Sequence, residues 1–236
     1  MIKENITDLL FLDIETAPEY ASFQDVPDKM KLLWEKKTVN LRKENDTPES
    51  IYGRAGIWAE FGRIICICCG YIALRGDKKI LRVKSFYDDD ERAILQGFAD
   101  LVQNFFKLRP YAALCAHNGK EFDMPYIARR MIINKMNLIP QLRVQGKKPW
   151  EVPFADTMEL WKFGDYKHFC SLDLLSEIMG LPTPKDDIDG GKVAEVYYTE
   201  KNIERIVTYC IKDVTAVANL MLRYMNEDPI DETVEV

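Results

Sequence analysis

The order of strand-like and helix-like segments constrains the fold of this chain more than any other feature of the sequence. Apolar runs bounded by turn residues predict strands, and apolar residues at helical spacing predict amphipathic helices. We expect strands at 8–14, 63–74, 80–87, 111–118 and 152–157, and helices at 88–108, 123–135 and through most of the C-terminal third. Three antiparallel strands followed by strands that alternate with helices predict an α/β fold, in which helices flank a mixed sheet.

The chain is expected to form one domain over residues 1–236, with two irregular parts. A length of 236 residues, 47% of them hydrophobic, supplies enough apolar material for one sizeable core. Residues 20–60 interrupt the strand pattern, and we interpret them as an insertion that acts as a lid, as a site for a protein partner or as a disordered loop. Residues 226–236 are acidic and contain proline, which predicts either a frayed end or a packed arm.

The sequence predicts a cytoplasmic protein without a membrane segment. The N-terminal stretch MIKENITDLLFLDIE has no long apolar run, and no window reaches the length of a membrane span. Six cysteines occur, three of them in the apolar run RIICICCGYIAL, which lacks the paired spacing of a zinc ribbon. We therefore interpret the cysteines as reduced and structural.

The motif DIE places two acidic residues at the end of the first predicted strand. Side chains two positions apart on a strand point to the same face, so Asp13 and Glu15 can approach one ion together. Hard divalent cations such as magnesium prefer carboxylate oxygen ligands. The alternative is an acidic pair that only solubilises a turn.

The motif NGKEFD lies between a predicted strand and a predicted helix. Asp123 would hold a metal ion there, and Asn118 would serve as a polar anchor near the end of a substrate. The alternative is that Asp123 caps the helix and Phe122 packs beneath it, because an acid at a helix start is favoured by the helix dipole.

Tyr209 and Asp213 lie four positions apart in the predicted C-terminal helix and therefore share a face. A tyrosine hydroxyl there could position an attacking water while the aspartate holds a metal. The alternative is a buried tyrosine beside a solvated aspartate. Several carboxylates brought together without a cation would repel one another, so the combination of the three motifs favours a divalent-metal site.

These motifs resemble those of the DEDD superfamily of 3′-5′ exonucleases, which has a ribonuclease H-like fold, and in particular the proofreading exonuclease domain of family B DNA polymerases. The matching segments are DIE at 13–15, NGKEFD at 118–123 and YCIKD at 209–213. The tyrosine in the third motif, where other members have histidine, places the resemblance in the DEDDy subgroup. Residues 171–198 are similar to the corresponding segment of stand-alone exonucleases related to these polymerase domains.

The resemblance implies two divalent cations, magnesium or manganese, and a role for each motif residue. Asp13, Glu15 and Asp213 would hold the first ion, and Asp13 would also hold the second. Asp123 would bind the second ion, and Tyr209 would orient the attacking water. The remaining candidates are expected to contact the substrate: Thr16, Asn118 and Phe122.

The leading hypothesis is therefore a metal-dependent 3′-5′ exonuclease that acts on the 3′ end of single-stranded nucleic acid in DNA repair or proofreading, with DNA favoured over RNA. It would release nucleoside 5′-monophosphates. The net charge of −6 argues against strong sequence-independent binding of nucleic acid. The alternatives are a module on the same fold that binds nucleic-acid ends or a protein with little cleavage, and an exonuclease for RNA or oligoribonucleotides.

A few further residues receive narrower predictions. Several cationic residues after the second motif are candidates for phosphate contact: Arg129, Arg130 and Lys135 on the helix, and Arg143, Lys147 and Lys148 in RVQGKK. The favoured alternative is that they only form solvated faces. We expect Asp156 to support a strand end or cap a helix instead of binding metal, and His117 to have a structural role.

Overall fold

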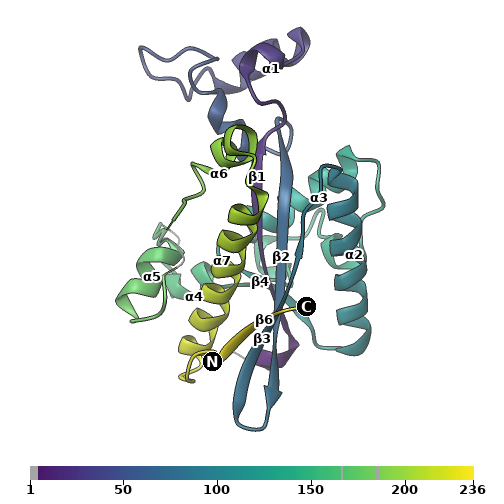
Figure 1. The fold of residues 1–236 in the computed structure, drawn as a ribbon, viewed down its shortest axis with the longest axis vertical. Coiled ribbons are helices and arrows are strands. Elements are labelled where there is room, and N and C mark those ends of the chain that lie inside the picture. The colour runs from purple at the N-terminus through teal and green to yellow at the C-terminus, as the bar shows by residue number, and fades with distance from the viewer. Residues whose placement is uncertain (1–4, 166, 184–186) are drawn as a thin grey trace.

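The computed structural model describes residues 5–165, 167–183 and 187–236. Within these residues the chain forms a six-stranded sheet in the order β5-β4-β1-β2-β3-β6 (Figure 1). The strands are β1 Leu9–Pro18, β2 Gly62–Arg75, β3 Lys78–Phe86, β4 Ala113–Ala116, β5 Ala155–Asp156 and β6 Glu232–Glu235. The helices are α1 Asp28–Thr38, α2 Glu91–Leu108, α3 Asp123–Ile133, α4 Thr157–Lys162, α5 Leu172–Ile178, α6 Val193–Glu195 and α7 Ile203–Tyr224.

The sheet is mixed, which confirms the predicted fold class. Strands β1, β2 and β3 form an antiparallel meander, and β4 and β5 add to the β1 edge in parallel. The observed β1 continues to Pro18, four residues beyond the predicted end, because its second half pairs with β2. The fifth strand is shorter than predicted, because the segment pairs only through Ala155 and Asp156 before α4 begins.

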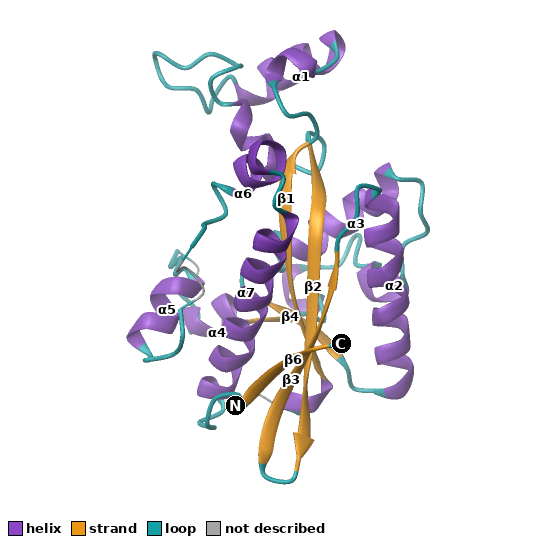
Figure 2. Cartoon of the chain, viewed as in Figure 1, coloured by secondary structure: helices purple, strands orange, loops and turns teal. Residues whose placement is uncertain are grey.

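Helices cover both faces of the sheet, and alternate residues of β1 enter two different cores. Leu10, Leu12 and Ile14 pack with residues of α2 and α3, whereas Phe11 packs with residues of α7. Figure 2 shows α7 on one side of the strands and α2 on the other. Because the pleat alternates, the odd-numbered positions that follow Phe11 on β1 are directed toward α7.

Residues 20–60 form a small structured unit beyond the end of β1. Its centre is the fully buried indole of Trp34 on α1, which makes edge contacts with the rings of Tyr52, Trp58 and Phe61. The indole N–H donates to the carbonyl oxygen of Pro48 at 2.7 Å. These contacts give the segment its own apolar cluster, separate from the two cores of the sheet.

The C-terminal segment adds the last strand of the sheet. Glu232–Glu235 pairs in parallel with β3, and the backbone of Asp231 donates to the carbonyl of Lys79 at 2.9 Å. The described part of the tail is therefore attached to the sheet edge. None of the described helices has the length and hydropathy of a bilayer span.

Candidate active site

The first two acidic residues lie side by side on β1 and face α7. Asp13 pairs across the strands with Cys68, and Glu15 pairs with Cys66. The register between β1 and β2 shifts just after Glu15, which marks a bulge at the end of the acidic pair. Glu15 is 6% exposed, and Asp13 is partly exposed.

Helix α7 brings the third motif to the same face of the sheet. Asn202 caps the helix, its side chain accepting from the backbone N–H of Arg205 at 3.2 Å. Two turns further on, Tyr209 and Asp213 project from one side of the helix, and each is 8% exposed. The charge of Asp213 raises the pKa of Asp13 and of Glu15, and all three carboxylates raise the pKa of Tyr209, so the structure brings the two motifs together.

Asp123 approaches the cluster from the other side of β1, at the first turn of α3. It is the first helical residue and not the cap, because the cap position is occupied by Phe122. Asp123 is 4% exposed, and its charge acts on both Asp13 and Glu15. All three motifs therefore contribute carboxylates to one site.

The loop before α3 is held in place by Asp156. Its carboxylate accepts from the backbone N–H of Asn118 and Lys120, each at 3.0 Å, and from Met158 and Glu159 at the start of α4. Asn118 has a positive φ of 61°, which asparagine tolerates better than most residues. Asp156 therefore caps α4, as expected from the sequence, and also fastens the second motif to the β5 edge.

Gly119 shows why the loop can lie so close to the sheet. A Cβ atom at this position would lie 2.4 Å from the Cβ of Ala116 and 2.8 Å from the sulfur of Met124. Only glycine fits this approach. The side-chain oxygen of Asn118 is buried and accepts no hydrogen bond from the described residues, so it is available to a bound group.

Burial and mutual repulsion raise the pKa of every carboxylate for which a shift is resolved in the cluster. For Asp13, burial has the largest effect on the pKa, followed by the charges of Asp213 and Glu15. For Glu15, burial and then the charge of Asp213 raise the pKa well above its usual value. Burial raises the pKa of Asp123 to about 7. The deprotonated site therefore favours a cation.

The donor set fits a hard divalent cation. Asp13, Glu15, Asp123 and Asp213 offer carboxylate oxygens, which magnesium and manganese prefer. A carboxylate oxygen of Asp13 and one of Glu15 also lie within 4.8 Å of each other and of the Cys210 sulfur. These residues are the ones that would hold metal ions in this protein.

The tyrosine of the third motif remains protonated in this environment. Burial raises the pKa of Tyr209 far above its usual value, and the charge of Asp213 raises it further. A hydroxyl with such a pKa is a hydrogen-bonding group at neutral pH and not a base. Tyr209 can therefore orient a water molecule but cannot deprotonate it.

The structure gives the other candidate residues partners within the protein. The ring of Phe122 packs against that of Tyr126, with centroids 5.4 Å apart. The hydroxyl of Thr16 interacts with that of Tyr126. His117 uses both ring nitrogens, at 2.9 Å from the hydroxyl of Thr157 and 2.9 Å from the carbonyl of Cys170, and burial lowers its pKa. These contacts agree with a structural role for the histidine.

The prediction that Arg130 contacts phosphate is wrong. The guanidinium is buried and forms a bidentate ion pair with Glu91, at 2.8 and 2.5 Å, and a further bond to Glu19 at 2.9 Å. Position 130 points into the core because it lies on the face of α3 that packs on the sheet, whereas Arg129 is exposed. The two arginines therefore lie on different faces of α3, Arg129 on the exposed face and Arg130 on the buried one.

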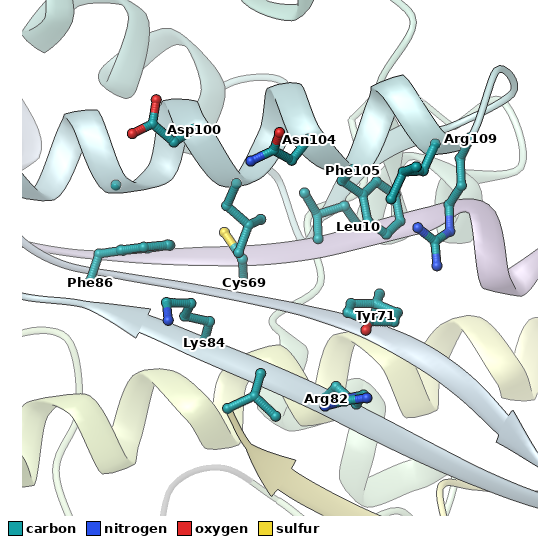
Figure 3. Close-up of a pocket in the computed structure, with 14 residues that line it drawn as sticks. Leu10, Cys69, Tyr71, Arg82, Lys84, Phe86, Asp100, Asn104, Phe105 and Arg109 are labelled. Atoms are coloured by element: carbon teal, nitrogen blue, oxygen red, sulfur yellow. The ribbon is translucent and has the colours of Figure 1, made fainter.

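A pocket of about 410 Å³ lies away from this site. Figure 3 shows it between α2 and the sheet, with Tyr71, Phe105 and Arg109 among its labelled residues. The Arg109 guanidinium lies over the rings of Tyr71 and Phe105, at 5.1 and 4.3 Å from their centroids. None of the predicted site residues lines this pocket.

The raised pKa values predict how pH affects the metal-free protein. The folded state holds protons on these carboxylates more tightly than the unfolded state does. The stabilisation that these protons give the folded state is therefore complete at low pH. For Asp123 it is lost as the pH rises from 3.8 through about 7. We expect the Tm in chelator to fall by at least about 3 °C more in wild type than in Asp123→Asn between pH 5 and pH 8.

Magnesium should reverse this loss, because a ligand that binds only the folded state stabilises it. Differential scanning fluorimetry with and without magnesium would measure the effect at both pH values. We expect a larger magnesium-induced rise in Tm at pH 8 than at pH 5. Equal rises at both pH values in wild type would contradict a carboxylate metal site.

Comparisons with known proteins identify the family of the chain and a solved structure with a similar fold. A family model described as "Predicted 3'-5' exonuclease related to the exonuclease domain of PolB" matches residues 57–232. This match includes Asn118, Asp123, Tyr209 and Asp213 and begins after the DIE motif.

The fold is also similar to a solved structure, the family B DNA polymerase from the hyperthermophilic archaeon Pyrobaculum calidifontis. The TM-score is 0.52 at 15% sequence identity, and the match covers 92% of this chain. The chain spans 24% of the length of that polymerase chain. At this identity the likeness shows a shared fold.

Proposed function

Because the chain belongs to the family of predicted 3′-5′ exonucleases related to the exonuclease domain of PolB, we propose that it is a metal-dependent exonuclease acting on the 3′ end of single-stranded DNA. The observation that supports this most directly is the meeting of Asp13, Glu15, Asp123 and Asp213 at one buried site. The family match covers the second and third motifs, and β1 supplies the first.

The chemistry would depend on divalent ions held by these carboxylates. Bound magnesium or manganese supplies an activated water and stabilises the charge that develops on the phosphate and on the leaving oxygen. Secondary structure fixes the positions of these carboxylates relative to one another, because Asp13 and Glu15 lie on a paired strand and Asp213 lies on a long helix. The products would be nucleoside 5′-monophosphates.

Two further groups would position the reactants. The protonated hydroxyl of Tyr209 would hold the attacking water by a hydrogen bond. The free side-chain oxygen of Asn118 would accept a hydrogen bond from the terminal nucleotide, since it has no partner among the described residues. Thr16 and Phe122 lie next to the acidic positions and would line the path of the last nucleotide.

Shortening of labelled strands would test the activity. A single-stranded DNA with a 5′ label should give a ladder of shorter products in magnesium or manganese, and none in chelator. Circular single-stranded DNA, which has no end, should stay intact. The same ladder assay with RNA of matched sequence decides between the two substrate classes, and we expect DNA to be degraded faster. Cleavage of the circle would overturn the proposal of an exonuclease.

Replacing Tyr209 with phenylalanine should separate positioning from metal binding. The variant keeps the ring and loses only the hydroxyl, so we expect kcat to fall by about 10²-fold through poorer orientation of the water. Its magnesium-induced rise in Tm should equal that of wild type. Asp213→Asn should lose both the cleavage activity and the magnesium-induced rise in Tm. Fluorimetry and steady-state cleavage would measure the two properties. Loss of the magnesium response in Tyr209→Phe would contradict the assigned role.

A further inference from the structure

Three cysteine thiols lie directly beside the carboxylates. Cys66 and Cys68 come from β2 and Cys210 comes from α7, and each is 0% exposed. The sulfurs of Cys66 and Cys68 are 3.7 Å apart, and all three sulfurs lie within 4.8 Å of one another. The two strand cysteines also face the acidic pair, because Cys68 is the cross-strand neighbour of Asp13. The thiols and the carboxylates therefore form one continuous cluster.

The spacing of these atoms matches tetrahedral coordination of zinc. With zinc–sulfur bonds of about 2.3 Å, two sulfurs in a tetrahedral site lie about 3.8 Å apart. The observed separation of Cys66 and Cys68 is close to this value. The sulfur of Cys210 lies 3.4 Å from Oδ2 of Asp13. Asp13 and Glu15 form a separate group with Cys210, so Cys210 links the thiols to the acidic pair.

We propose that Cys66, Cys68 and Cys210 form a second metal site that takes a zinc-class cation. Soft thiolates select zinc or cadmium, whereas magnesium prefers oxygen, so the two sites differ in the metal that they bind. Asp13, which is partly exposed, adjoins Cys210 on the side of the acidic pair. Binding releases the thiol protons to solvent.

The position of the thiol site beside the carboxylates has a consequence for cleavage, which rests on the proposed exonuclease activity. A cation held by the thiols would lie next to Asp13 and would repel the cations that the carboxylates hold. Zinc should therefore inhibit cleavage even in excess magnesium. The alternative is that the thiols only fill space as small apolar groups, and the two possibilities differ in whether metal binds at all.

Cadmium binding would test the site without relying on activity. Cadmium is titrated into reduced, chelator-treated protein while the ultraviolet thiolate-to-metal charge-transfer band is recorded. Wild type should give a band that saturates at one equivalent. Cys210→Ser should bind at least about 10²-fold more weakly. The matched control is Cys69→Ser, because Cys69 adjoins Cys68 in sequence but packs in the opposite core. It should behave as wild type.

Each outcome decides the proposal. The absence of a charge-transfer band in folded wild type would overturn it, and so would a band that Cys69→Ser removes or Cys210→Ser retains at full affinity. If Cys210→Ser does not fold, Cys66→Ser takes its place and should show the same loss of affinity. A normal cadmium band in a protein without nuclease activity would support the thiol site and count against the exonuclease. Nuclease activity in a protein that gives no cadmium band would count against the thiol site alone.

Discussion

Replacing Asp13 with asparagine is expected to lower exonuclease activity by about 10³-fold, since a lost metal ligand removes several kcal/mol of transition-state stabilisation. The fold should survive, because the substitution preserves shape and removes one charge from a cluster in which the carboxylates repel one another. We therefore expect a Tm in chelator at neutral pH that equals or exceeds that of wild type, together with a reduced magnesium response. Single-turnover cleavage and fluorimetry would measure the two effects.

The matched control for this experiment is Asp8→Asn. Asp8 lies just before β1, outside the acidic cluster. It should cleave at the wild-type rate and keep the full magnesium response. Asp13→Asn with normal activity would show that the cluster does not hold the catalytic metal, and a large fall in its Tm would show that Asp13 stabilises the fold instead.

Replacing Arg130 with alanine is expected to lower the free energy of unfolding by about 3–5 kcal/mol, because Glu91 would remain buried without its partner. Glu91 also accepts from the backbone N–H of Ile64 at 2.7 Å, so its carboxylate fixes the bulged start of β2. Arg130 in turn donates to the carbonyl of Ala59 at 2.9 Å. The loss should therefore loosen the connection between α3 and the segment that precedes β2.

Urea unfolding would measure this effect, with Arg129→Ala as the control. Arg129 is the preceding residue on the same helix but is exposed, so its truncation should change stability by no more than about 0.5 kcal/mol. Equal stabilities for the two variants would contradict the assigned ion pair. If Arg130 instead contacted substrate, its truncation would raise KM and leave the unfolding midpoint unchanged.

The sequence predicts much of this architecture because its local signals agree with the tertiary structure. The apolar run at the start of β1 and the cysteine-rich run of β2 form buried strands, and the turn RGDKK joins β2 to β3. Asp90 caps helix α2, and its side chain accepts from the backbone N–H of Arg92. In these places, residues that are close together in sequence determine the strand, the helix or the helix cap.

Other features depend on contacts between distant residues and could not be predicted. The carboxylate of Asp156 caps α4, which the sequence indicates, but its bonds to Asn118 and Lys120 span more than thirty residues. The helical phase that buries Arg130 follows from the packing of α3 on the sheet. The thiol cluster is similar, because Cys66 and Cys68 form a pattern in sequence while Cys210 reaches them only through the placement of α7.

The measurement that tests the central claim most directly is the release of nucleoside 5′-monophosphate from a 3′-labelled single strand of DNA. Wild type, Asp13→Asn and Asp123→Asn would be compared in magnesium and in chelator. The account predicts rapid, magnesium-dependent release of the labelled mononucleotide by wild type, and release that is slower by about 10³-fold in both variants. Release that persists in chelator, or that both folded variants retain at the wild-type rate, would contradict the claim that these carboxylates form a metal-dependent exonuclease site.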